Sequence, residues 1–124
     1  MPAPWRLSNR TTAAAPATAT LAAPPLASGM VIRLLGMQGA LTMGAAAGTD
    51  VLQVLDGATV IWQMDIGAPA NSTAMAPPGL PFDIRASPGN SMTVRFLNGT
   101  GTVAEDVNAQ GDYVANGAGY YGVV

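Results

Sequence analysis

The 124-residue sequence contains no cysteine, no histidine and no lysine. Without cysteine the chain has no disulfide framework and no thiol nucleophile, and without cysteine and histidine it has no zinc site of the usual kind. The lack of histidine and lysine also excludes a histidine-based catalytic triad and a Schiff-base lysine. We therefore expect a protein that is not an enzyme and that needs no cofactor.

Charge is scarce as well. Charged residues make up 10% of the chain, against roughly 25% in an average soluble protein. Five arginines on a chain of net charge -2 do not predict a basic surface for nucleic acid. With 49% apolar residues the chain can build one domain with a core. Such a composition is typical of a subunit whose surface is covered by neighbours in an assembly.

Long apolar segments are also absent. The N-terminal residues Trp5, Arg6 and Arg10 are not followed by an apolar block of the signal-peptide type. Elsewhere Gly, Pro, Arg or Asp interrupts every apolar stretch before it reaches the length of a membrane span. We expect a protein that is made in a cytoplasm and does not contact a membrane.

Glycine and proline are plentiful and lie between short apolar runs. Strand candidates recur about every 8 to 15 residues with turn residues between them, which is typical of sandwiches and jelly rolls. The sequence therefore predicts an all-β fold, an antiparallel β-sandwich or jelly roll of about seven or eight strands. We expect this domain over residues 17–114, an extended N-terminal arm over 1–16 and a C-terminal tail over 115–124.

The clearest local signal is the dipeptide Asp56-Gly57, which lies between apolar strands expected at 51–55 and 58–66. Asp-Gly between two such runs predicts a β-hairpin. In the second strand the bulky apolar residues occupy alternate positions and share one face: Val60, Trp62, Met64 and Ile66. Further strands are expected at 17–21, 29–37, 82–85, 92–97, 103–108 and 113–114, with loops at 44–48 and 67–79.

Carboxylates in the expected domain could in principle form an acid/base pair or a calcium site. Their spacing does not match a calcium-binding loop, and several fall on the outward face of alternating strands. We therefore favour structural roles for these acids: Asp56, Asp65, Asp83, Glu105, Asp106 and Asp112.

The arginines and the terminal aromatic residues are candidate contacts to a partner. Arg33, Arg85 and Arg95 fall within strands, where each is either a solvated charge or a contact to an acidic surface. A tryptophan beside an arginine in an arm is a good anchor on another protein, although terminal aromatics can also have no role. Trp62 is expected in the core. The candidate contact residues are Trp5, Arg6, Arg10, Arg33, Tyr120 and Tyr121.

Three stretches resemble small virion proteins of tailed bacteriophages: VLDGATVIWQ at 54–63, PGNSMTV at 88–94 and VNAQGDY at 107–113. The shared pattern is an Asp-Gly turn, a strand with V-[IL]-W, a turn before a strand, and a closing N-A-Q-G-Y that Asp112 interrupts here. The resemblance covers roughly residues 17–114. It implies a decoration or cement protein on the outer capsid surface that bridges subunits of the major capsid protein, forms a homo-oligomer such as a trimer and has no active site.

A second reading is a receptor- or glycan-binding module of a head or tail fibre. Its binding residues would come from exposed aromatics and from the polar loops at 71–76 and 98–102. An enzyme is the least favoured reading, because no set of residues offers a nucleophile, a general base and an oxyanion site.

Overall fold

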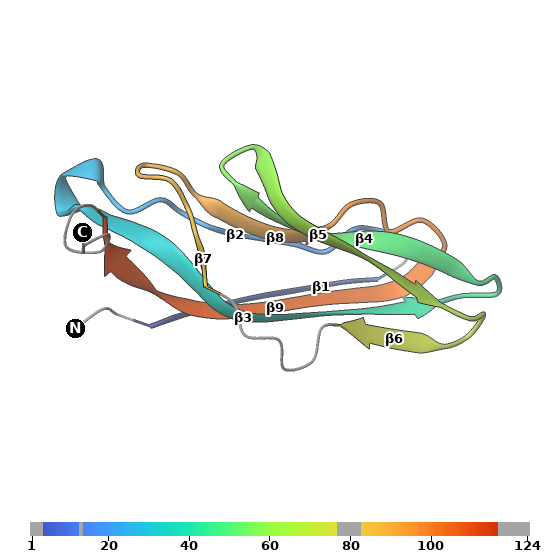
Figure 1. Ribbon diagram of the computed structural model, residues 1–124. Helices are drawn as coiled ribbons and strands as arrows, with labels where there is room; N and C mark the ends of the chain where they lie inside the picture. Colours follow the sequence, from blue (N-terminus) through green and yellow to red (C-terminus); the bar gives the residue numbers. More distant parts are fainter. Residues whose placement is uncertain (1–3, 13, 77–82, 117–124) are drawn as a thin grey trace.

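The computed structural model describes residues 4–12, 14–76 and 83–116, and it consists of two antiparallel sheets packed face to face (Figure 1). The first sheet has the order β1 (Trp5–Thr12), β9 (Thr102–Ala115), β3 (Met30–Met43) and β6 (Thr73–Ala76), and β7 (Ile84–Arg85) also pairs with β3. The second sheet has the order β2 (Thr18–Leu21), β8 (Met92–Phe96), β4 (Gly48–Asp56) and β5 (Thr59–Ala68).

The chain crosses repeatedly from one sheet to the other. β1 and β3 lie in the first sheet, whereas β2 and β4 lie in the second, and β8 and β9 repeat the crossing at the end of the chain. This strand order is that of a jelly roll, in which eight strands form two four-stranded sheets, and β7 is a short addition to it. The predicted fold class is confirmed. Within the described residues no helix could cross a membrane, since the only helix is a three-residue 3₁₀ turn at Leu26–Ser28.

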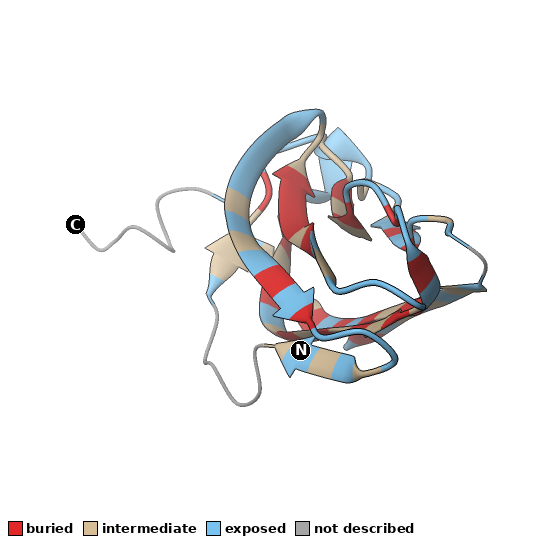
Figure 2. Ribbon diagram, turned by 90° about the vertical axis from the view of Figure 1, so that its right-hand side faces the viewer, coloured by how far each residue is buried: buried red, intermediate tan, exposed pale blue. Residues whose placement is uncertain are grey.

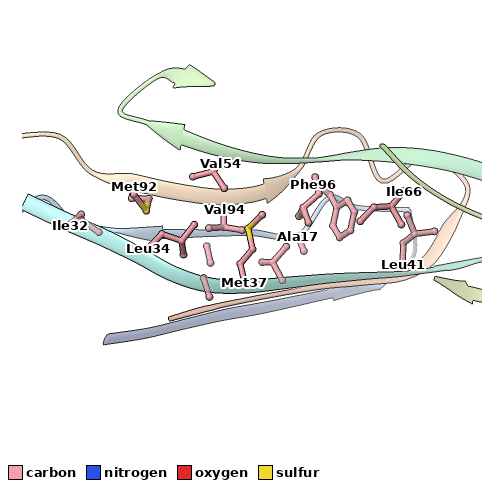
Figure 3. Packing of buried hydrophobic residues seen from close by; sticks show 14 of the residues in the cluster. Ala17, Ile32, Leu34, Met37, Leu41, Val54, Ile66, Met92, Val94 and Phe96 are labelled. Atoms are coloured by element: carbon pink, nitrogen blue, oxygen red, sulfur yellow. The ribbon is translucent and has the colours of Figure 1, made fainter. Parts of the chain in front are cut away.

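The core lies between the sheets and follows from the alternation along the strands (Figures 2 and 3). Ile32, Leu34 and Leu41 of β3 point inward and meet Val94 and Phe96 of β8. All five side chains are almost completely buried. Inward residues at every second position therefore hold the two sheets together through apolar contact.

The Asp56-Gly57 hairpin joins β4 to β5, and Gly57 has the positive φ of 61° that this turn requires. One part of the prediction is wrong. The register shifts beside Val54 and Leu55, so that Val54 pairs with Trp62 and Leu55 with Val60, and Ile61 is the extra residue of a β-bulge. The bulge turns Val60 away from the core, and its side chain is 39% exposed.

The N-terminal segment differs from the expected arm. Residues Trp5–Thr12 form β1, which pairs with β9 along its whole length from Trp5–Gly111 to Thr12–Ala104. The sandwich thus begins before residue 17. Alternation explains this strand, because Trp5 and Leu7 face the interior whereas Arg6 and Ser8 face outward.

Two other segments also differ from expectation. The loop expected at 67–79 contains β6, which pairs with β3. The strands expected at 103–108 and 113–114 are parts of the single long strand β9. At the C-terminal end Ala115 still belongs to β9, and the Asn116 N–H donates to the Gly29 carbonyl oxygen. The rest of the expected tail lies outside the described residues.

Candidate interaction surface

The outer face of the first sheet carries mostly polar side chains, with Ala40 and the exposed Met75 among them. Outward positions on neighbouring strands lie side by side, as in the row formed by Ser8 on β1, Asn108 on β9 and Gln38 on β3. Two rows further on, the Thr42 and Thr73 hydroxyls hydrogen bond at 2.7 Å. We call this surface the polar face and define it by Ser8, Arg10, Gln38, Thr42, Thr73, Asp106 and Asn108.

The charges on the polar face cancel. Arg10 Nη1 lies 2.9 Å from Asp106 Oδ2, and the two residues are direct neighbours across β1 and β9. The Arg10 side chain is 65% exposed, so this ion pair adds little stability. Arg10 therefore lies on the surface, as expected of a contact residue, but Asp106 already balances its charge.

Two further arginines also form ion pairs. Arg33 donates from Nε and Nη2 to the two Asp112 oxygens at 2.8 and 2.6 Å. Arg85 Nε lies 3.0 Å from Asp83 Oδ1, and this contact holds the pKa of Asp83 below its usual value. The Arg33 side chain is only 25% exposed and its two-pronged hydrogen bond is satisfied by Asp112. Its predicted role as a partner contact therefore gains no support from the geometry.

Arg6 is different. It is exposed, and among the described residues it has no ion-pair or hydrogen-bond partner. Its side chain lines a shallow hollow of about 410 Å³ beside Pro4, Leu35 and Gln110. Of the arginines predicted as contacts, Arg6 is the one whose guanidinium remains available.

Trp5 does not lie free in an arm, as the prediction of a partner contact assumed. Its ring belongs to the core, the residue is 8% exposed, and Nε1 donates to the Asp112 carbonyl oxygen at 2.9 Å. The inward ring fits because the opposite residue on β9 is Gly111. Tyr120 and Tyr121 lie outside the described residues, so their predicted contact role stays a prediction.

The outer face of the second sheet has a different chemistry. Arg95 Nε donates to Gln53 Oε1 at 3.0 Å, and Gln53 Nε2 donates to Gln63 Oε1 at 3.0 Å, which links three neighbouring strands. Near the hairpin Val60 and Ile61 are 39% and 40% exposed. This face therefore combines a side-chain ladder with an apolar border along β5.

A pair of carboxyl groups lies inside the sandwich, and one member, Asp50, is not among the acids singled out from the sequence. Asp50 on β4 is 2% exposed and Glu105 on β9 is 0% exposed. Asp50 accepts hydrogen bonds from the backbone N–H groups of Val51, Asn98 and Gly99 at 2.8, 3.0 and 2.6 Å. Glu105 Oε1 accepts from the Ala17 N–H at 3.4 Å.

The two carboxyl groups titrate in opposite directions. Burial, the hydrogen bond to Asp50 and the negative charge of Asp50 raise the pKa of Glu105 to about 9. Burial alone would also raise the pKa of Asp50, but hydrogen bonds from Glu105 and from three backbone N–H groups outweigh it and lower that pKa. At neutral pH Glu105 is therefore protonated, whereas Asp50 is ionised.

The pair resembles an acid/base dyad in chemistry but not in position. Both side chains are closed off from solvent, so no substrate reaches them. Among the described residues no three acidic side chains gather into a metal site. A signal for the pair was present in the sequence, because Asp50 alternates with Leu52 and Val54 and Glu105 alternates with Val107, which places both acids on inward faces.

Asp56 has a wider role than its turn. Its carboxylate accepts from the Ser87 N–H at 3.0 Å, from the Ser87 hydroxyl at 2.6 Å and from Asn90 Nδ2 at 2.9 Å. Burial opposes ionisation, but these hydrogen bonds lower the pKa of Asp56. The hairpin acid thereby fastens the loop between β7 and β8, in keeping with the structural role expected for it.

Comparison with known proteins found neither a matching family model nor a matching curated protein. Among solved structures, the chain is similar to a protein of the Cowpea mosaic virus empty virus-like particle, with 10% identity, coverage of 94% of this chain and 84% of the other, and a TM-score of 0.44. The chain is also similar to a structure of infectious bursal disease virus, Gx strain, with 10% identity, coverage of 94% of this chain and 33% of the other, and a TM-score of 0.40.

The insecticidal delta-endotoxin Cry8Ea1 from Bacillus thuringiensis is also similar, with 10% identity, coverage of 87% of this chain and 19% of the other, and a TM-score of 0.38. These neighbours include virus particles and a toxin. Identities and TM-scores of this size carry no conclusion about what the present chain does.

Proposed function

We propose that this protein is a structural component of a bacteriophage virion, a decoration protein on the outer surface of the head. In this proposal the polar face contacts the major capsid protein and each copy bridges neighbouring capsid subunits. The protein acts without a cofactor, an active site, nucleic acid or a membrane. The sequence resemblance to small head proteins motivates the proposal, and the polar face is the observation that carries it.

The polar face suits a protein that binds another folded surface. Its two charged residues, Arg10 and Asp106, pair with each other, so docking over them buries no unpaired charge. Serine, threonine, asparagine and glutamine side chains there can form hydrogen bonds directly or through water. A single contact of this type is weak. Many copies that each bridge two capsid subunits resist separation together, because each bridge makes the next contact intramolecular.

The described surface favours this reading over a glycan-binding module. Small-molecule sites are lined mainly by apolar and aromatic side chains. Among the described residues, Trp5 and Phe96 are buried, and Trp62 and Tyr113 pack against the core. The described part of the chain therefore offers no exposed aromatic platform for a sugar ring.

The test uses heads of a phage that carries this gene, prepared from a strain in which the gene is deleted. Purified protein should bind these heads to saturation and raise the temperature at which they release DNA. Asn108→Arg, at the centre of the polar face, should weaken binding at least tenfold, whereas Thr18→Arg on the outer face of the second sheet should bind like the wild type. The proposal fails if wild-type protein does not bind or if bound protein leaves head stability unchanged. Loss of binding in Thr18→Arg alone would assign the contact to the other face.

A further inference from the structure

We propose that copies of this chain associate head to tail, with the free edge of β1 in one copy pairing with the free edge of β5 in the next and with Arg6 facing Asp65. This contact lies at the edge of the first sheet and shares only Ser8 with the polar face. It does not depend on whether the protein binds a capsid.

The two strands lie at opposite edges of the sandwich. β1 is an edge strand of the first sheet and lies beside β2, whereas β5 is an edge strand of the second sheet and lies beside β6. Among the described residues, no strand and no backbone hydrogen bond covers the outer side of β1 or of β5. Uncovered strand edges are templates for pairing with another chain.

The β5 edge also lacks the usual protection against such pairing. Proteins commonly place lysine, proline or several charges on an edge strand. β5 has ten residues, none of them lysine, arginine or proline, and its only charged residue is Asp65. The bulge at Ile61 is the one protective feature, and it leaves the segment from Trp62 to Ala68 regular.

Charge decides which edges pair. Arg6 on β1 and Asp65 on β5 are exposed, and neither has an ion-pair or hydrogen-bond partner among the described residues. Pairing β1 with a second β1 offers Arg6 no acidic residue, and pairing β5 with a second β5 offers Asp65 no basic residue, because β1 has no acid and β5 has no base. Head-to-tail pairing instead places opposite charges on neighbouring strands, which is the favourable arrangement.

The alternation of side chains is consistent with this pairing. Arg6 and Ser8 both point to the outer face on β1, and Asp65 and Gln63 both point to the outer face on β5. An antiparallel register with Arg6 opposite Asp65 therefore places Ser8 opposite Gln63, a pair of polar side chains on the same face. One ion pair and one polar pair are thus made without turning any apolar residue outward.

Contact between two different edges is heterologous and leaves a free edge at each end. Such contacts continue until a ring closes or a filament grows. The proposal therefore predicts assembly beyond a closed two-fold dimer.

The test measures molecular mass by sedimentation and light scattering over a range of protein concentrations. The wild type should assemble as concentration rises. Arg6→Asp and Asp65→Arg should each weaken assembly at least tenfold. The double variant R6D/D65R should regain it, and so should a mixture of the two single variants, because every mixed contact then joins one acid to one arginine. Raised salt should weaken wild-type assembly through screening.

Controls separate this contact from folding and from capsid binding. Asn108→Asp and Asn108→Arg change the charge at the centre of the polar face and should leave self-association unchanged. Circular dichroism reports whether a reversed charge disturbs folding. If it does, the neutral variants Arg6→Gln and Asp65→Asn replace the reversed ones, and they should weaken assembly less than a charge reversal does. A wild type that stays monomeric, single variants that assemble normally, or a double variant that stays monomeric would each overturn the proposal.

Discussion

Glu105 on β9 and Asp50 on β4 form a buried carboxyl pair inside the sandwich, and their interaction raises the pKa of Glu105 and lowers that of Asp50. Asp50 also accepts from the backbone of Asn98 and Gly99, which form the turn between β8 and β9. Glu105 also accepts from the N–H of Ala17, the residue directly before β2. The pair therefore fixes the β1–β2 connection and the β8–β9 turn at one place.

Glu105→Gln should flatten the fall in stability with rising pH between about 4.5 and 9. The folded-state pKa of Glu105 is raised from 4.5 to about 9, so between these values the folded chain holds a proton that the unfolded chain has released. Over that range the wild type should lose about 1.4 kcal/mol of unfolding free energy per pH unit from this group. Glutamine keeps a hydrogen-bond donor but has no such titration.

Urea titrations of both proteins from pH 5 to pH 9 check this prediction. The variant should gain stability relative to the wild type as pH rises. Parallel pH profiles for the two proteins would show that Glu105 is ionised in the folded state.

Asp50→Asn should destabilise the fold by about 2 to 4 kcal/mol, because one amide oxygen cannot replace two carboxylate oxygens that accept several hydrogen bonds in the interior. Asp65→Asn is the matched control, since Asp65 is exposed, and it should change stability by less than about 0.5 kcal/mol. Denaturant midpoints measured at low protein concentration give both values. Equal losses of stability in Asp50→Asn and Asp65→Asn would contradict a special structural role for the buried Asp50 carboxylate.

Trp5→Ala should cost about 3 to 5 kcal/mol, the usual effect of removing a large aromatic ring from a core. The neighbouring Arg6→Ala variant should have little effect on unfolding at low protein concentration, because Arg6 points outward. Thermal unfolding followed by circular dichroism measures both. If Trp5→Ala were as stable as the wild type, the N-terminal segment would behave as the free arm that its sequence first suggested.

Gly111→Ala should prevent normal folding or cost more than about 3 kcal/mol, since the added methyl group would overlap the Arg33 carbonyl group and the Trp5 ring. Gly36→Ala is the matched control on β3. There the nearest atom to the added methyl group is the side chain of Gln110 at 3.4 Å, an ordinary contact, so the variant should fold normally. Comparable loss of soluble protein in both variants would contradict the close packing of Trp5 on Gly111.

The sequence carried enough information for the fold class and for the central hairpin. Asp56-Gly57 marked the turn between β4 and β5, and alternation marked the strands on both sides. It did not reveal the bulge at Ile61, because a bulge depends on pairing with β4 rather than on β5 alone. Val60 was therefore assigned to the wrong face.

The N-terminal strand was missed for a related reason. β1 is held by β9, about a hundred residues away along the chain, and a short segment of mixed polarity shows little of that pairing. Its period-two alternation was nevertheless visible in Trp5, Arg6, Leu7 and Ser8. The buried acids were harder to foresee, since Asp50 and Glu105 come from different sheets and meet only in the folded chain.

The central claim is that this jelly roll is a structural part of a virion and lies on the outside of the head. A reconstruction of purified particles by electron cryo-microscopy tests it most directly. The account predicts density for the sandwich on the outer surface, at positions where major capsid subunits meet, with the polar face turned toward the shell. The claim would be contradicted if well-resolved heads lacked this density and mass spectrometry of the same particles found no copy of the chain.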